Sequence, residues 1–276
     1  MSADPFAVIE DVRFSYGRRA GVLALDGVSL ELERGSVLGL IGGNGSGKTT
    51  LARHLNGLLR PSTGRVMVEG LDTARHDVRV LARYVGYVFQ NPSHQLFART
   101  VAEELAFGPR NLECSPEEVD GRVGAAAETL GLTDVLQAHP RRLPFPLRKL
   151  VAIAAVLTMR PSLLVLDEPT MGQDHRMARR IADLIRELRD GGTTVVCATH
   201  DLALVAVVAH RLVVLRDGRV VADDTPRTVL SDRALMAATG LTPPQITELS
   251  LSMPGRAGRS AALSIDELVA EVRAAS

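Results

Sequence analysis

Hydrophobic residues follow two different patterns in the segments that we predict to be strands. A period of two over Ala7–Phe14 and Val28–Leu32 predicts strands with one buried face, and Asp26-Gly27 between them predicts a turn. Elsewhere, short uninterrupted apolar runs predict strands buried on both faces, which is the pattern of a parallel sheet. The further strands predicted are Ser36–Ile41, Arg65–Glu69, Tyr84–Phe89, Ser162–Leu166, Thr193–Ala198 and Arg211–Arg216.

Helical spacing fills the segments between these strands and a longer stretch in the middle of the chain. Met177–Arg189 is amphipathic, whereas Val151–Met159 is apolar on all sides, as a buried helix is. The alternation of strands and helices stops over residues 91–160, which predicts a helical insertion in an α/β domain. From Arg233 the chain holds helical pieces and a polar segment, Gly255–Ser260. The remaining predicted helices are Thr50–Leu59, Pro116–Leu130 and Leu202–Ala209.

Composition narrows the possible functions. The chain has 276 residues, of which 46% are hydrophobic, enough for a sizeable core. Lys+Arg and Asp+Glu each number 32, so the net charge is zero and we expect no nucleic-acid partner. The N-terminus lacks a signal-peptide pattern, and the longest apolar runs are too short to span a bilayer. Any membrane role is therefore expected to come through a partner protein.

A phosphate-binding motif, G-x-x-x-x-G-K-[ST], is present at Gly42–Thr49, between a predicted strand and a predicted helix. Its glycines let the backbone N–H groups turn toward phosphate oxygens, and the helix presents its positive end to the same anion. Lys48 is placed to reach the β- and γ-phosphates, and the Thr49 hydroxyl to ligate Mg²⁺. The alternative is a glycine-rich turn that binds nothing, but the strand–loop–helix context favours a site for ATP and Mg²⁺.

Two acids, Asp167 and Glu168, end a predicted buried strand, and His200 ends another. If these strands lie beside the one that leads into the phosphate loop, the three side chains meet at its carboxyl edge. Asp167 is then placed to hold Mg²⁺, Glu168 to polarise an attacking water, and His200 to contact the γ-phosphate. The alternatives are a solvated turn or helix cap for the acids and a structural role for the histidine.

Taken together, these residues resemble the ATP-binding-cassette (ABC) family of transporter ATPases over nearly the whole chain. The resemblance implies a P-loop NTPase (RecA-like) α/β core with a parallel sheet, an antiparallel β subdomain and a helical insertion. It also implies a nucleotide-binding domain over residues 1–232, with a helical subdomain at about 91–160, and an extension over 233–276. The matching positions are Tyr16, Gly42–Thr49 (Walker A), Gln90 (Q-loop), Asp167-Glu168 (Walker B and the catalytic glutamate), Met171–Asp174 (D-loop) and His200 (switch histidine).

The resemblance assigns each of these residues an expected role. Glu168, His200 and Gln90 are expected to be catalytic, and Thr49, Gln90 and Asp167 to bind the metal. The nucleotide is expected to contact Tyr16, which stacks on adenine in the family, together with Gly42, Gly43, Asn44, Gly45, Ser46, Gly47, Lys48, Thr49 and Thr50.

Within the family, Val88–Phe97, Val101–Asn111 and Leu241–Gln245 resemble the energy-coupling factor branch, which drives uptake of vitamins and transition-metal ions. This implies a transmembrane subunit, a separate substrate-binding membrane protein, and a peripheral location on the cytoplasmic face of the membrane. Leu96-Phe97 either line the groove for the transmembrane subunit or are ordinary core residues.

One segment departs from the family. Leu143–Leu147 aligns with the signature Leu-Ser-Gly-Gly-Gln, which offers a serine hydroxyl and glycine N–H groups to the γ-phosphate of a partner's ATP. Pro144 and Pro146 have neither group, and Phe145 adds bulk where glycine permits close approach. In a family whose domains dimerise head to tail, this predicts an asymmetric heterodimer with a second ATPase that carries an intact signature.

Three alternatives remain for the function. A soluble cassette ATPase usually carries coiled-coil insertions or two cassettes, which we do not find in the sequence. The second alternative is a phosphate-loop kinase or GTPase; a GTPase should show an Asn-Lys-x-Asp motif, which we also do not find. A non-catalytic regulatory cassette fits the altered signature but not the intact Glu168 and His200.

Overall fold

Two β-sheets organise the chain, which a computed structural model describes over residues 4–17, 22–253 and 261–275. Within these residues the larger sheet has six strands in the order β10-β9-β3-β8-β7-β6, and the smaller has four in the order β2-β1-β4-β5. Strands β9, β3, β8, β7 and β6 pair in parallel, β10 is antiparallel to β9, and the small sheet is antiparallel. The strands are β1 Ala7–Phe14, β2 Leu25–Leu32, β3 Val37–Ile41, β4 Thr63–Val68, β5 Leu71–Asp72, β6 Val85–Val88, β7 Leu163–Asp167, β8 Thr194–Ala198, β9 Arg211–Arg216 and β10 Arg219–Asp224.

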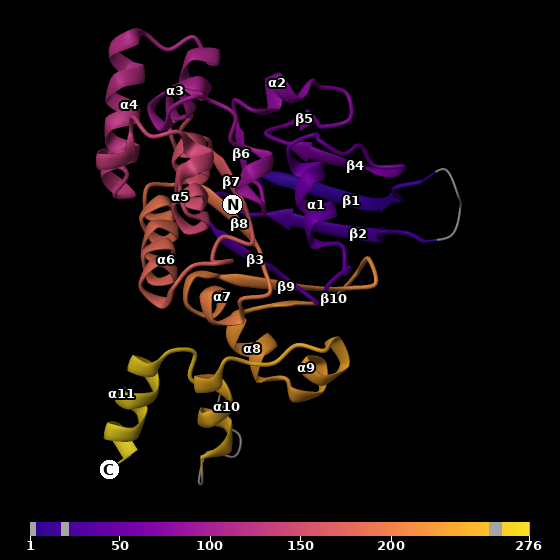
Figure 1. Ribbon diagram of the computed structural model, residues 1–276. Coiled ribbons are helices and arrows are strands. Elements are labelled where there is room, and N and C mark those ends of the chain that lie inside the picture. The colour runs from indigo at the N-terminus through magenta and orange to yellow at the C-terminus, as the bar shows by residue number, and fades with distance from the viewer. Residues whose placement is uncertain (1–3, 18–21, 254–260, 276) are drawn as a thin grey trace.

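Helices cover both faces of the large sheet, as Figure 1 shows. Helix α1 contacts β7 and β8 on one side and β4 on the other, so it lies between the two sheets. On the opposite face, α6 contacts β8 and α7 contacts β3. The helices are α1 Lys48–Leu55, α2 Val78–Leu81, α3 Val101–Asn111, α4 Pro116–Thr129, α5 Phe145–Leu157, α6 His175–Asp190, α7 Leu202–Val208, α8 Pro226–Ser231, α9 Arg233–Thr239, α10 Gln245–Ser252 and α11 Ile265–Ala275.

Successive residues of the parallel strands face two separate cores. In β3, Val37 and Ile41 belong to the core that α5, α6 and α7 complete, whereas Leu38 and Leu40 belong to the core shared with α1 and the antiparallel sheet. All five residues of β3 are buried. Burial on both faces is why this strand is an uninterrupted apolar run in the sequence.

The helical insertion forms one end of the molecule (magenta in Figure 1), where α3 contacts both α4 and α5. Helices α3 and α4 each begin with a capping box, from Thr100 with Glu103 and from Ser115 with Glu118. Helix α5 carries the buried apolar surface that attaches the insertion to the sheet. The predicted α/β class, with its parallel sheet, antiparallel sheet and inserted helices, is confirmed.

Three local predictions were wrong. Asp26-Gly27 is not a turn between strands but a bulge inside β2, where Gly27 has φ 74° and the register with β1 shifts. The predicted helix Thr50–Leu59 ends at Leu55, because Gly57 adopts φ 72°. Helix α5 begins at Phe145, well before the predicted Val151, because proline is tolerated in a first helical turn.

The C-terminal helices pack on the sheet through α8, which contacts α7, β9 and β10. Helix α10 contacts α8 and α11, and Arg227 of α8 pairs with Glu267 of α11. The predicted polar segment Gly255–Ser260 lies outside the described residues. Among the residues that are described, none of the helices has the length and apolar content needed to cross a membrane.

Candidate functional site

The phosphate loop connects the end of β3 to the start of α1. Gly42, Gly45 and Gly47 have φ values of 150°, 78° and 106°, which side-chain-bearing residues rarely adopt. A Cβ on Gly42 would collide with the Leu215 carbonyl oxygen, and one on Gly47 would lie 2.6 Å from the Ala24 carbonyl oxygen. The loop conformation therefore requires glycine at these positions.

Polar groups in the loop are arranged as an anion site. Lys48 is 8% exposed, and its ammonium donates to the carbonyl oxygens of Gly42 (2.8 Å) and Gly43 (3.0 Å). Burial lowers the pKa of Lys48, and the nearby Glu168 and Asp167 carboxylates oppose that shift. Ser46 Oγ is buried without a hydrogen-bond partner among the described residues, beside the N-terminus of α1. An unpaired buried hydroxyl at a helix N-terminus fits a bound phosphate group.

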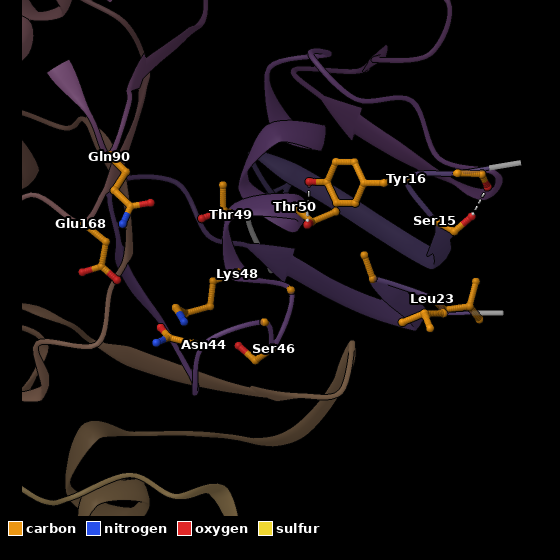
Figure 2. Close-up of a pocket in the computed structure, with 15 residues that line it drawn as sticks. Ser15, Tyr16, Leu23, Asn44, Ser46, Lys48, Thr49, Thr50, Gln90 and Glu168 are labelled. Atoms are coloured by element: carbon orange, nitrogen blue, oxygen red, sulfur yellow. Dashed lines mark hydrogen bonds between the residues drawn. The ribbon is translucent and has the colours of Figure 1, made fainter. Parts of the chain in front are cut away.

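A pocket of about 700 Å³ lies over this loop. Figure 2 shows Gln90 and Glu168 on one side of it, facing Lys48 and Thr49, with Tyr16 at the other side. Tyr16 is 62% exposed, and its hydroxyl lies 2.9 Å from Thr50 Oγ1. The volume suits a nucleotide-sized ligand.

Asp167 ends β7 next to the phosphate loop. The residue is 1% exposed, and its carboxylate accepts from the Thr49 hydroxyl at 3.1 Å and from the Tyr87 hydroxyl at 3.0 Å. Burial raises the pKa of Asp167, while the Tyr87 and Thr49 hydrogen bonds act in the opposite direction. A carboxylate and a hydroxyl oxygen in contact are ligands that Mg²⁺ prefers.

Glu168 is held at the pocket wall by the end of β8. Thr199 Oγ1 donates to Glu168 Oε2 at 2.8 Å, the His200 backbone N–H donates to the same carboxylate, and His200 Nδ1 lies 2.9 Å from Oε1. Glu168 has φ 49°, an uncommon conformation for a residue with a side chain. Such backbone strain is concentrated at functional sites.

The remaining sequence-predicted residues occupy less constrained positions. Gln90 lines the pocket but is exposed, and its side-chain amide bonds Met171 Sδ at 3.8 Å. Leu96 is a core residue, whereas Phe97 is 58% exposed and packs edge-to-face on Phe107. Sequence reasoning missed Tyr87 and Thr199, which bond the two acids from neighbouring strands. Their spacing carries no signal, because the contact depends on strand order.

The residues of the segment that departs from the family signature contact other residues of this chain. Pro144 precedes α5 without a side-chain cap. The Phe145 ring lies against Gly172, where an added Cβ would be 2.8 Å from Phe145 Cδ1. The Pro146 carbonyl accepts from Gln173 Nε2 at 3.2 Å, and the Arg148 guanidinium lies over the Phe145 ring. These residues present no hydroxyl and few free N–H groups.

A parallel sheet with a glycine-rich loop at a helix N-terminus, and with acids at the neighbouring strand end, defines a phosphate-loop nucleotide-binding protein. The model for the family described as "ABC transporter" matches residues 25–171, more than half of the sequence. The chain belongs to the ABC transporter ATP-binding family. A model for an AAA domain also matches a shorter stretch, residues 147–206.

Individual relatives agree with this family. The chain is 43% identical over 240 residues to the cobalt import ATP-binding protein CbiO of Rhodobacter capsulatus, covering 86% of both. It is 43% identical over 258 residues to the energy-coupling factor transporter ATP-binding protein EcfA2 of Symbiobacterium thermophilum, covering 91% of this chain and 88% of that protein. A relative in Caldanaerobacter subterraneus, TTE1589, is 40% identical over 260 residues, which are 94% of this chain but only 44% of that longer protein.

Solved structures show the same fold. The cbiO1 structure from Clostridium perfringens, titled as part of the ABC transporter complex cbiONQ, superposes with a TM-score of 0.75 at 34% identity, covering 90% of this chain and 99% of that one. The dimeric post-hydrolysis structure of the ATP-binding cassette MJ0796 with ADP and Pi gives 0.74 at 25% identity, covering 80% and 99%.

Proposed function

We propose that this chain is the ATP-binding and ATP-hydrolysing subunit of an importer of the energy-coupling factor type. The observation that carries the proposal is the convergence of Lys48, Thr49, Asp167 and Glu168 around one pocket, with Asp167 and Thr49 already in contact. Similarity to CbiO and EcfA2 over most of both chains supports the transporter branch.

In this proposal the loop and α1 hold the phosphates of ATP. Lys48 would exchange its two loop carbonyls for the β- and γ-phosphate oxygens, and Ser46 Oγ would gain the partner that it lacks. The N–H groups of residues 42–50 would complete the cradle, and Tyr16 would carry the adenine ring. Thr49 and Asp167, with Gln90, would bind Mg²⁺, which neutralises charge on the β- and γ-phosphates when bound.

Glu168 is proposed to act as the general base. Its carboxylate would accept a proton from a water aligned for attack on the γ-phosphate, while the leaving oxygen departs with ADP. Thr199 and His200 hold both carboxylate oxygens in place, which pre-organises the base. His200 is exposed at the same edge and would contact the γ-phosphate from the other side of Glu168.

The altered signature segment points to an asymmetric heterodimer. A second ATPase with an intact signature would complete the site built on Lys48 and Glu168, whereas Leu143–Leu147 would leave the opposite site inactive. The domain division at residue 232, with the insertion at about 91–160 and the extension at 233–276, belongs to this proposal.

The membrane partners follow from the same branch. A transmembrane subunit would dock near Gln90 and the exposed Phe97–Phe107 pair, which would hold the chain at the cytoplasmic face of the membrane. A separate membrane protein would bind the substrate, a vitamin or a transition-metal ion. The relative named for cobalt import makes a metal ion the first substrate to test.

Affinity purification of the tagged chain from native membranes tests the assembly. We expect to recover a polytopic membrane protein and a second cassette ATPase with an intact signature, both identified by mass. Recovery only from the soluble fraction, as a monomer or homodimer, would instead support a soluble or regulatory ABC ATPase without a membrane partner.

A further inference from the structure

Only two of the 32 basic residues in this chain are lysines, and the other basic residues are all arginine. One lysine, Lys48, lies in the phosphate loop. The other, Lys149, lies in the second turn of α5, two residues after the altered signature segment. Lysine therefore occurs at only two positions of this chain, and the first of them lines the nucleotide pocket.

Lys149 is fully buried and joins two parts of the site. Its ammonium donates to the carbonyl oxygens of Phe89 (2.9 Å), Gln90 (3.1 Å) and Asp167 (3.0 Å). An ammonium group has three donors, so these three carbonyls use its full capacity. Two of the acceptors belong to the segment after β6 and one to the end of β7, while Lys149 itself belongs to the helical insertion.

The geometry of this site explains why it holds a lysine. Three carbonyl oxygens converge on one nitrogen within 3.1 Å, which suits a compact ammonium with three rotatable donors. A guanidinium is larger, and its donors lie in one plane, so it cannot replace this contact without moving the backbone. Burial lowers the pKa of Lys149 to about 8, while Asp167 and Glu168 favour its charged form.

We propose that Lys149 is a positioning residue of the nucleotide site: by fixing the backbone of Gln90 and of Asp167 to α5, it sets the metal-binding geometry. This rests on the proposed function, in which Gln90 and Asp167 bind Mg²⁺ with ATP. The contact also links α5 to the backbone of both metal-binding residues, so a shift of α5 against the sheet would act on Gln90 and Asp167 together.

Equilibrium binding of ATP to the purified chain, with Mg²⁺ and with EDTA, tests the proposal. Removing a group that supports the ligands of a metal site typically lowers metal affinity ~10–100-fold. We therefore expect Lys149→Met to reduce the gain in ATP affinity that Mg²⁺ produces by about 10-fold. ATP affinity in EDTA should stay close to that of the wild type, because the phosphate loop is unchanged. We expect the same loss in Lys149→Arg, because its planar donors do not fit.

Arg148→Met is the matched control. The substitution removes a positive charge from the residue next to Lys149 in α5. The Arg148 guanidinium contacts Ser93 and Phe145 and none of the three carbonyls that Lys149 binds. The control should retain the full Mg²⁺ effect. If Lys149→Met lowers the melting temperature but keeps the full Mg²⁺ effect, Lys149 has only a structural role and the proposal is overturned. Full Mg²⁺ enhancement in Lys149→Arg would overturn the requirement for lysine.

A second measurement covers the case in which Lys149→Met fails to fold. Lysine labelled with ¹³C at Cε gives two side-chain NMR signals in the wild-type chain, which Lys48→Arg assigns. Mg²⁺–ATP should shift the Lys149 signal, and ATP in EDTA should shift only the Lys48 signal. An unchanged Lys149 signal under both conditions would overturn the proposal. If Mg²⁺ adds no affinity in the wild type, the proposed metal site itself is wrong.

Discussion

Two segments of this chain lead into helices that belong to nucleotide sites in the family, and they are built in opposite ways. The loop Gly42–Gly47 has three glycines at positive φ and a buried lysine directly after it. The segment Leu143–Leu147 has two prolines and a phenylalanine before and within the first turn of α5. The first exposes donors to a ligand, and the second replaces them with packing contacts.

The difference shows that a helix N-terminus is not by itself an anion site. Helix α1 becomes one because glycines let the preceding backbone curl around the ligand and leave Ser46 Oγ without a partner. At α5, Pro144 and Pro146 remove N–H groups, and the Phe145 ring turns onto Gly172 of the same chain. The chain therefore combines a phosphate loop rich in donors with a segment, Leu143–Leu147, that has neither a serine hydroxyl nor glycine N–H groups.

The largest expected effect concerns Glu168, the proposed general base beside the phosphate loop. In the assembled complex, Glu168→Gln should lower ATP turnover by ~10²–10⁴-fold, because an amide cannot act as general base. ATP affinity should change little, since the phosphate loop is untouched. Steady-state turnover and equilibrium ATP binding measure the two quantities, and undiminished turnover would move the base to another residue.

The next prediction concerns the altered signature segment, Leu143–Leu147. The purified chain alone should be nearly inactive, and replacing Leu143–Leu147 with Leu-Ser-Gly-Gly-Gln should raise its turnover by ~10²–10³-fold, the usual worth of pre-organised donors. The assay is ATP hydrolysis at a protein concentration that allows dimers. Robust turnover by the unmodified chain alone would refute the asymmetric heterodimer.

A smaller effect is expected at the lysine of the loop. Lys48→Ala should weaken ATP binding by ~10–100-fold, which corresponds to the loss of one or two charge-assisted hydrogen bonds. Calorimetry with and without Mg²⁺ should show the loss under both conditions. The fold should be kept, because Lys48 bonds only loop carbonyls in this structure. A loss confined to Mg²⁺ would place Lys48 beside the metal instead of the phosphates.

Local patterns in the sequence predicted the sheet and the phosphate loop well, because both depend on neighbouring residues. The apolar run Ser36–Ile41 and the glycines after it are sufficient to predict a buried strand and a curled loop. The turn predicted at Asp26-Gly27 was wrong because a glycine at positive φ occurs in a β-bulge as well as in a turn. Helix α3 was not predicted, although Thr100 and Glu103 form a capping box at its start. Gly108 and Pro109 lie within its last turn, and both residues are unfavourable inside helices.

Contacts between strands could not be predicted from any one segment. Tyr87 bonds Asp167 because β6 and β7 are neighbours, and Thr199 bonds Glu168 because β8 follows β7 in the sheet. The three acceptors of Lys149 come from two such strand ends. Polar positioning of this kind becomes visible only when strand order is known.

The smallest expected effect tests whether the altered segment is held by packing. Gly172→Ala introduces a Cβ at φ 74°, 2.8 Å from Phe145 Cδ1, so it has both a backbone cost and a steric cost. Gly131→Ala is the matched control, with φ 65° and no atom within 4 Å of the added Cβ. The control should cost ~1–2 kcal/mol of unfolding free energy from the left-handed backbone alone.

Overpacking should add ~1 kcal/mol to the cost of Gly172→Ala. In a Phe145→Ala background the added cost should vanish, so Gly172→Ala and Gly131→Ala would then destabilise equally. Denaturant unfolding of the four variants and their parents measures these differences. Equal costs with Phe145 present would mean that the ring moves away from Gly172 at no cost, and that packing against Gly172 does not hold the altered segment.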